Sequence, residues 1–286
     1  MHLEPFELHR PGSVEEAVRL TRELGTGADL LAGGTDLLPN YKMHLNARPH
    51  LVALEDIPEL GEHSLARIGA MARLSALESD ERFTSTYPGI ADALREVATP
   101  LVRARATVGG NLLVETRCFF FNQSYFWRES LGFCLKASGD RCHVVPQKER
   151  CYATFSGDLA PALAVLGAEV EIAGPDGRRR LPLLELYDAG GDGIRRLAIA
   201  PGEIVVAVHL PEDARGRRSS YQKLRVRPAF DFPELGLAAS ATLDGEVVES
   251  LRIAAGGLET YPRAFDDLTR ALEGERLTDE RIRTLG

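Results

Sequence analysis

The chain has 286 residues, of which 44% are apolar, and a formal net charge of −8. This length supplies enough apolar side chains for one large or two medium domains. The acidic balance argues against nucleic acid and against an anionic membrane as partners, because phosphate binding needs a dense basic surface. The N-terminus lacks the features of a signal peptide, and no apolar run approaches the roughly 20 residues that cross a bilayer, so we expect a cytoplasmic protein.

The first half of the chain mixes helical and strand patterns. Val14 to Leu24 follows a potential N-cap residue, Ser13, and carries apolar residues at helical spacing, which predicts a helix. Asp29 to Ala32 is a short apolar run that predicts a strand. It ends in the pair Gly33-Gly34, and helical character returns from Leu37 to His44. Further strands are predicted at 50–54 and 67–71, and a further helix at 88–97.

The second half is richer in strand patterns. A helix is predicted at 158–166, and a hairpin joins strands at 168–172 and 178–183 through the turn Gly174 to Gly177. The segments 204–210, 221–226, 235–243 and 251–255 are typical of successive antiparallel strands. These four strands predict a separate C-terminal domain, and we place its boundary near residue 180.

Two glycine segments each pair glycines with a following polar residue beside an apolar run. They are Ala32-Gly33-Gly34-Thr35-Asp36 and Thr107-Val108-Gly109-Gly110-Asn111. Glycine lets backbone N–H groups turn toward an anion, and a group of such donors is a diphosphate site. Neither segment is a G-x-G-x-x-G or a P-loop sequence. Each alone is more often a plain turn, but two in one domain favour a phosphate site.

All four cysteines lie within one stretch of 34 residues, at Cys118, Cys134, Cys142 and Cys151. In a reducing cytoplasm such clustering favours a metal over disulfides. The close C-x2-4-C pair of zinc sites is absent, and so is the C-x2-C-x2-C run of small ferredoxins. The spacing therefore leaves three alternatives open, which in order of preference are an iron–sulfur cluster, a structural zinc site and unmetallated thiols.

The cysteine stretch also contains an aromatic run, residues 119–127, with the only tryptophan of the chain. We expect this run to form a small apolar core rather than a binding surface. His143 directly follows Cys142, but with four cysteines available we expect it to be a bystander and not a metal ligand.

Five segments in order along the chain resemble the FAD-binding medium subunits of molybdenum hydroxylases, the xanthine dehydrogenase and carbon monoxide dehydrogenase group. They are Leu31 to Leu37, Ala106 to Leu112, Ser156 to Leu163, Pro201 to Ile204 and Tyr221 to Pro233. The resemblance implies an α+β fold, with a two-subdomain FAD-binding domain of the PCMH/VAO type over residues 1–180 that a cysteine-bearing insertion interrupts at 115–153. An α+β C-terminal domain with an antiparallel sheet would occupy 181–286. Relatives usually continue through a last helical segment beyond Arg281 to Gly286, so this domain is expected to be truncated or short.

The insertion itself is similar to that of the β subunit of 4-hydroxybenzoyl-CoA reductase, in which four cysteines bind a [4Fe-4S] cluster. This likeness implies that Cys118, Cys134, Cys142 and Cys151 are cluster ligands. By the same resemblance the FAD diphosphate would be held by the two glycine segments, at Ala32, Gly33, Gly34, Thr35, Asp36, Thr107, Gly109, Gly110 and Asn111. Asp158 would contact the flavin nucleotide, and Lys223 and Asp231 would lie near the flavin.

The implied activity is electron transfer, and no catalytic residue is expected in this chain. Electrons would pass from a ferredoxin through the cluster and FAD to a small [2Fe-2S] subunit and a large molybdopterin subunit, which would dehydroxylate an aromatic acyl-CoA thioester. Medium subunits of this kind usually occur in a dimer of heterotrimers. One alternative is the FAD subunit of an oxidising xanthine, aldehyde or CO dehydrogenase. Another is a non-catalytic zinc-binding module.

Overall fold

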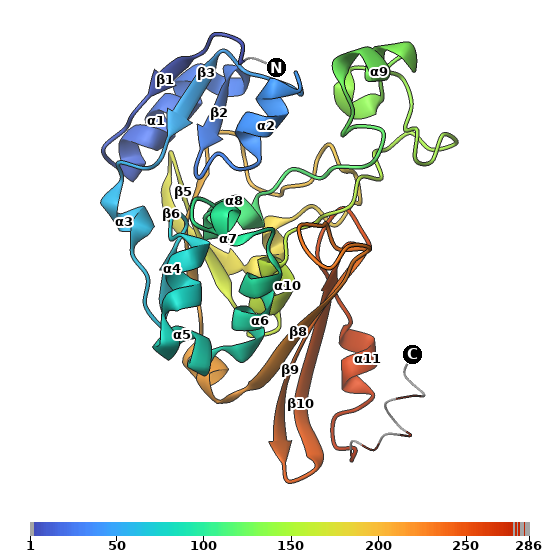
Figure 1. The fold of residues 1–286 in the computed structure, drawn as a ribbon. Helices are drawn as coiled ribbons and strands as arrows, with labels where there is room; N and C mark the ends of the chain where they lie inside the picture. Colours follow the sequence, from blue (N-terminus) through green and yellow to red (C-terminus); the bar gives the residue numbers. More distant parts are fainter. Residues whose placement is uncertain (1–2, 277, 279, 281–282, 284–286) are drawn as a thin grey trace.

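The computed structural model describes residues 3–276, 278, 280 and 283. Three sheets follow one another down the molecule, and the cysteine-bearing insertion projects beside the first of them (Figure 1). The predicted mixed α+β fold with an antiparallel C-terminal sheet is confirmed. Most of the terminal segment Arg281 to Gly286 lies outside the described residues.

The first sheet is parallel, with the order β1-β3-β2. Its strands are β1 (Glu7–His9), β2 (Ala28–Leu31) and β3 (His50–Ala53), and its helices are α1 (Val14–Leu24) and α2 (Leu37–Lys42). The predicted N-cap is confirmed, because the Ser13 hydroxyl accepts a hydrogen bond from the Glu16 N–H at 3.1 Å. Val14, Ala17 and Val18 on the buried face of α1 belong to the core that joins this sheet to the next.

The second sheet is antiparallel, with the order β4-β7-β5-β6. It contains β4 (Arg67–Gly69), β5 (Glu169–Gly174), β6 (Gly177–Pro182) and β7 (Ile204–His209). The predicted hairpin is the pair β5–β6. β7 is a strand as predicted, but it pairs with β4 and β5 and not with the C-terminal strands. The reason is burial: residues 204–208 are all buried, which requires a central position with both faces covered. The sheet therefore continues past the predicted boundary at residue 180.

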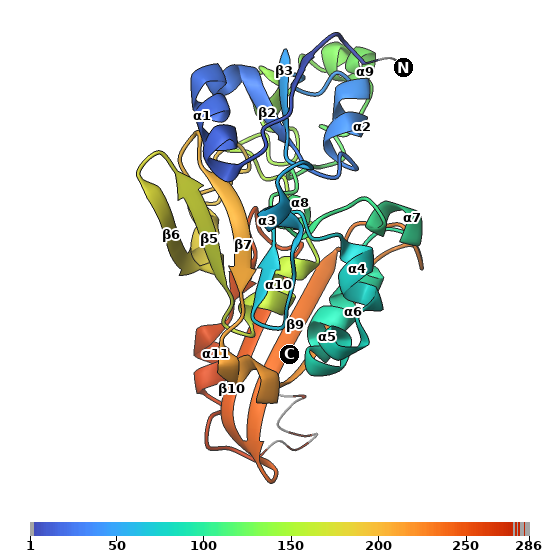
Figure 2. The ribbon, with the colours of Figure 1, turned by 90° about the vertical axis from the view of Figure 1, so that its left-hand side faces the viewer.

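The third sheet is antiparallel, with the order β11-β10-β9-β8. Its strands are β8 (Arg218–Leu224), β9 (Leu235–Asp244), β10 (Val247–Gly256) and β11 (Arg263–Ala264), and α11 (Asp266–Arg270) packs on β10. In Figure 2 the long strands β9 and β10 have α11 on one side and a group of helices on the other. The remaining helices are α3 (Pro58–Gly61), α4 (Leu74–Ser79), α5 (Glu81–Thr86), α6 (Pro88–Glu96), α7 (Pro100–Arg103), α8 (Val108–Leu112) and α10 (Leu159–Ala164).

One large core connects the second and third sheets. α6 packs on β8, and α10 packs on β9 and β10. Their buried residues Ile90 and Leu163 share a single apolar cluster with Val170 of β5 and Ala238 of β9. The C-terminal sheet is therefore packed directly onto the first domain. Short 3-10 helices lie at Gly25–Gly27, Leu135–Ala137, Leu183–Leu186 and Glu212–Gly216.

The insertion contains one short helix, α9 (Tyr125–Ser130), which stands apart from the sheets in Figure 1. The buried guanidinium of Arg128 fixes it to the end of α2 by donating to the carbonyl oxygens of Met43 and His44 at 3.1 and 3.0 Å. The expected aromatic core is confirmed only for Phe121, which is buried. Phe119 and Phe126 are 70% and 78% exposed. Of the described helices, none is long and apolar enough to span a membrane.

Candidate cofactor sites

The first glycine segment, residues 32–36, forms the loop between β2 and α2. Gly34 has a φ of +73°, which glycine adopts without strain. Within the described part of the chain, no protein acceptor receives a hydrogen bond from the backbone N–H groups of residues 33–36. Such a row of unpaired donors on a half-buried loop can bind an anion.

The second glycine segment forms a short helix and not an open loop. Residues 108–112 form the short helix α8, and Thr107 is its N-cap. The Gly110 N–H donates to Thr107 Oγ1 at 3.2 Å, and the Gly109 N–H donates to the Ala70 carbonyl at 2.8 Å. These two donors are thus used inside the protein, and what the glycines provide is close packing. Contact of this segment with a diphosphate stays a prediction.

The two glycine segments lie side by side, as a shared site requires. A Cβ at Gly33 would lie only 2.0 Å from the carbonyl oxygen of Arg105, just before the second segment. A Cβ at Gly110 would lie 3.9 Å from the Cβ of Ala32. The loop can approach the second segment this closely only because Gly33 has no side chain.

Asp36 turns toward the insertion. Its half-buried carboxylate forms an ion pair with Arg117 and accepts a hydrogen bond from Asn40 Nδ2 at 3.2 Å. Arg117 also donates to Asn40 Oδ1 at 2.9 Å and lies over the ring of Phe232 at 5.4 Å. Burial raises the pKa of Asp36, and the charge of Arg117 opposes that shift. Asp36 therefore fastens the insertion to the glycine loop, a role that sequence reasoning missed because a lone arginine has no motif.

Asp158 and Lys223, both predicted near the flavin, form a buried ion pair between α10 and β8. Lys223 Nζ lies 3.1 Å from Asp158 Oδ2 and donates to the Glu96 carbonyl at 3.1 Å. The Tyr221 hydroxyl donates to Asp158 Oδ1 at 2.7 Å. The two charged side chains are 1% and 4% exposed, and burial raises the pKa of Asp158 against the effect of Lys223. The pair connects the first domain to the C-terminal sheet.

Two further predicted residues make local contacts. Asn111 Oδ1 accepts a hydrogen bond from the Leu159 N–H at 3.1 Å, which joins the second glycine segment to the start of α10. Asp231 accepts a hydrogen bond from the Arg227 N–H at 3.0 Å and organises its own exposed loop. The flavin contacts predicted for Asp158, Lys223 and Asp231 stay predictions.

The four cysteines meet at one cavity in the insertion. Its lining residues are Cys118, Phe120, Phe121, Cys134, Leu135, Lys136, Cys142, His143 and Cys151. All four thiols are free, and all but that of Cys118 belong to buried residues. Burial raises the pKa of Cys118 and Cys151, so a metal must displace their protons to bind. This donor set fits a thiolate-bound metal centre.

The cavity wall also holds a cation that sequence reasoning missed. Lys136 is 7% exposed, and its ammonium contacts Glu115 and Thr116 and lies 5.4 Å from the centre of the Phe121 ring. Its only sequence signal is its position two residues after Cys134. His143 also lines the cavity, and its Nε2 lies 2.7 Å from the Phe133 carbonyl oxygen. Its role as a bystander stays a prediction.

Residues 4–213 match the model of the FAD binding domain in molybdopterin dehydrogenase, and residues 219–286 match the CO dehydrogenase flavoprotein C-terminal domain. The chain belongs to this family of FAD-binding medium subunits, which confirms the resemblance stated from the sequence.

Relatives and solved structures agree with this assignment. The chain is 34% identical to the aldehyde oxidoreductase FAD-binding subunit PaoB of Escherichia coli, over 91% of this chain and 83% of that one. It is 31% identical to the carbon monoxide dehydrogenase medium chain of Hydrogenophaga pseudoflava, over 97% and 83%. The structure of carbon monoxide dehydrogenase from that organism superposes with a TM-score of 0.78 at 28% identity, covering 100% of this chain and 86% of that one.

We expect Gly33→Ala to lower both FAD content and stability. The added Cβ would overlap the Arg105 carbonyl and force the loop away, at a cost of about 1–3 kcal/mol in unfolding free energy. Urea unfolding and flavin absorbance per chain measure the two effects. Gly216→Ala is the matched control, because its Cβ would meet nothing within 4 Å. Equal flavin content and stability in both variants would contradict the packing argument.

Removing one partner of the buried ion pair should be costly. Lys223→Met leaves the Asp158 carboxylate buried without its counter-ion, and we expect a loss of about 3–5 kcal/mol in unfolding free energy. The double variant Asp158→Asn with Lys223→Met should recover much of that loss. Lys148→Met, at an exposed position, is the control. If Lys223→Met is as stable as this control, the pair does not hold the domains together.

Proposed function

We propose that the chain is the FAD-binding electron-transfer subunit of an oxidising molybdenum hydroxylase of the aldehyde, xanthine or CO dehydrogenase type. The observation that carries the proposal is the row of unpaired N–H donors at residues 33–36, in a chain of the FAD-binding family. Its relatives include an aldehyde oxidoreductase subunit and carbon monoxide dehydrogenase chains. These names favour the oxidising alternative over the 4-hydroxybenzoyl-CoA reductase interpretation.

The residues of this chain would bind and orient a cofactor. The donors of Gly33, Gly34, Thr35 and Asp36 would hold the FAD diphosphate, and Thr107 to Asn111 would pack beneath it. FAD, when bound, accepts and releases electrons singly or in pairs. The ion pair of Asp158 with Lys223 would keep the C-terminal sheet in place beside the nucleotide. No side chain of the chain is assigned as a general acid or base.

The proposal extends to the cysteine cavity, where Cys118, Cys134, Cys142 and Cys151 would hold a [4Fe-4S] cluster. No three of the four sulfurs, all of which belong to described residues, lie within 4.8 Å of one another. A single zinc ion with bonds near 2.3 Å would hold its sulfurs about 3.8 Å apart. The support for a metal centre of this kind is that all four cysteines line one cavity, and Lys136 would lie beside the bound group.

Partners follow from the same family. The relatives are described as a subunit and as medium chains of larger enzymes. By analogy this chain would assemble with a small iron–sulfur subunit and a large molybdopterin subunit, in a dimer of heterotrimers. In an oxidising enzyme the chain would pass electrons outward to NAD or a quinone, the reverse of the flow from ferredoxin implied by the reductase likeness.

The direction of electron flow separates the two interpretations. The enzyme is assembled with its partner subunits, and an aldehyde is tried first because of the likeness to PaoB. We expect the aldehyde to bleach the flavin absorbance under anaerobic conditions, at a rate fast enough to support turnover. Reduced ferredoxin with an aromatic acyl-CoA thioester is the opposing arm. The oxidising assignment would be overturned if no aldehyde, purine or CO reduced the flavin. It would also have to be the case that reduced ferredoxin reduces the flavin and the thioester then reoxidises it.

A further inference from the structure

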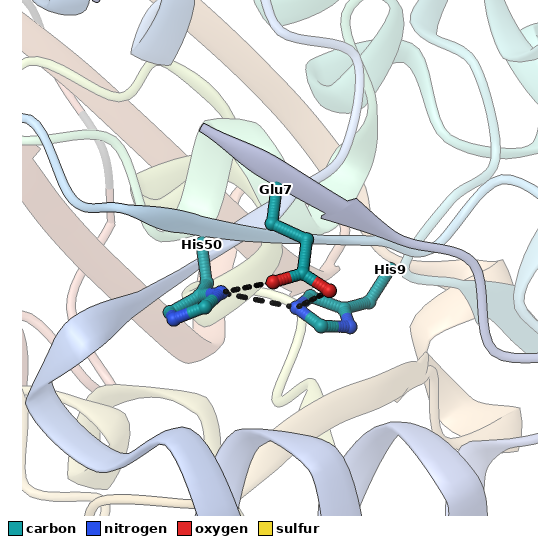
Figure 3. A group of neighbouring side chains, drawn as sticks. All are labelled: Glu7, His9 and His50. Carbon is teal, nitrogen blue, oxygen red and sulfur yellow. Dashed lines mark hydrogen bonds and ion pairs between the residues drawn. The ribbon is translucent and has the colours of Figure 1, made fainter. Parts of the chain in front are cut away.

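Three potential metal ligands meet at the edge of the first sheet, away from the cysteine cavity. Glu7 and His9 alternate along the edge strand β1 and so lie on the same face of the sheet. His50 begins β3, and the parallel register pairs Glu7 with His50. Figure 3 shows the three side chains turned toward one another on that face. The arrangement arises because two adjacent strands each place a ligand at the same level.

The ligand atoms lie close together. His9 Nε2 is 3.2 Å from His50 Nδ1, His50 Nδ1 is 3.4 Å from one carboxylate oxygen of Glu7, and His9 Nε2 is 3.9 Å from the other. Zinc bonds of about 2.0–2.1 Å in tetrahedral geometry place neighbouring ligand atoms about 3.3–3.4 Å apart. The longest separation involves Glu7, whose side chain is 66% exposed and can move to close it.

A hydrogen bond between the two imidazoles is the simpler explanation of the shortest contact. One proton, however, lies between only two of these atoms at a time, whereas a cation contacts all three. Two imidazoles and one carboxylate are also a ligand set that binds zinc with one position left open. The half-buried rings of His9 and His50, 18% and 29% exposed, are held by backbone that the sheet already orders.

We propose that Glu7, His9 and His50 bind one Zn²⁺ ion, with water as the fourth ligand. The ion would join the three-residue edge strand β1 to β3 through side chains as well as through the backbone ladder. It would thereby fasten the N-terminal end of the chain to the sheet whose other edge, β2, leads into the glycine loop. The site is separate from the cysteine cavity and does not depend on what that cavity binds.

Zinc alone is the probe, titrated into the untagged full chain against a chromophoric chelator. Because free cysteines also bind zinc, the informative quantity is the difference between variants. We expect His9→Gln and His50→Gln each to bind one equivalent fewer than the wild type. Glu7→Gln changes only an exposed side chain and should keep the fold while weakening this equivalent at least ~10-fold. His63→Gln, at a histidine paired with Asp80 at 3.4 Å, is the matched control and should bind as the wild type does.

Hydrogen exchange provides a second readout that the cysteines do not affect. Zinc should slow exchange of the amides of residues 7–9 and 50–53 in the wild type and in His63→Gln, but not in His50→Gln. The proposal would be overturned if Glu7→Gln and His50→Gln bound zinc with the stoichiometry and affinity of the wild type, and if zinc did not change hydrogen exchange in β1. The contact between His9 and His50 would then be a hydrogen bond and nothing more.

Discussion

The carbonyl oxygen of Arg105 stands where a side chain at residue 33 would begin, and the candidate FAD site depends on that contact. It lets the loop after β2 rest on the segment before α8, so two stretches more than 70 residues apart form one surface. In the loop held there, the N–H groups of residues 33–36 donate to no acceptor in the described part of the chain. A donor row fixed in this way binds an anion without first paying the entropy of ordering a flexible loop.

Charged side chains then link the remaining parts to this surface. Arg117 connects the insertion to the glycine loop through Asp36, and Lys223 connects the C-terminal sheet to α10 through Asp158. Both pairs are largely shielded from water. In such surroundings, removing one partner lowers the free energy of unfolding by more than the intact pair adds to it. Their effect is to set the relative positions of loop, insertion and sheet. An electron-transfer subunit, which is the role proposed for this chain, needs its cofactors at set positions, and these links help to fix those positions.

Local patterns in the sequence predicted local structure well. Ser13 caps α1 as expected, and the strand, glycine loop and helix from 28 to 42 follow the pattern of the residues. Pairing over long distances could not be predicted in the same way. The apolar run of β7 predicts a strand but not its neighbours. In the second glycine segment the N–H groups of Gly109 and Gly110 donate to Ala70 and Thr107, inside the protein. Arg117, Lys136 and the meeting of His9 with His50 depend on contacts that no local spacing encodes.

The proposals for this chain place FAD at the glycine loop and a cluster in the cysteine cavity of one subunit. Their most direct test is the content of iron, acid-labile sulfide, zinc and FAD per chain after anaerobic purification, for the wild type and for Cys134→Ser. We expect about four iron, four sulfide and one FAD in the wild type, and FAD without the intact cluster in the variant. Zinc in place of iron, or loss of flavin from a folded Cys134→Ser chain, would contradict them.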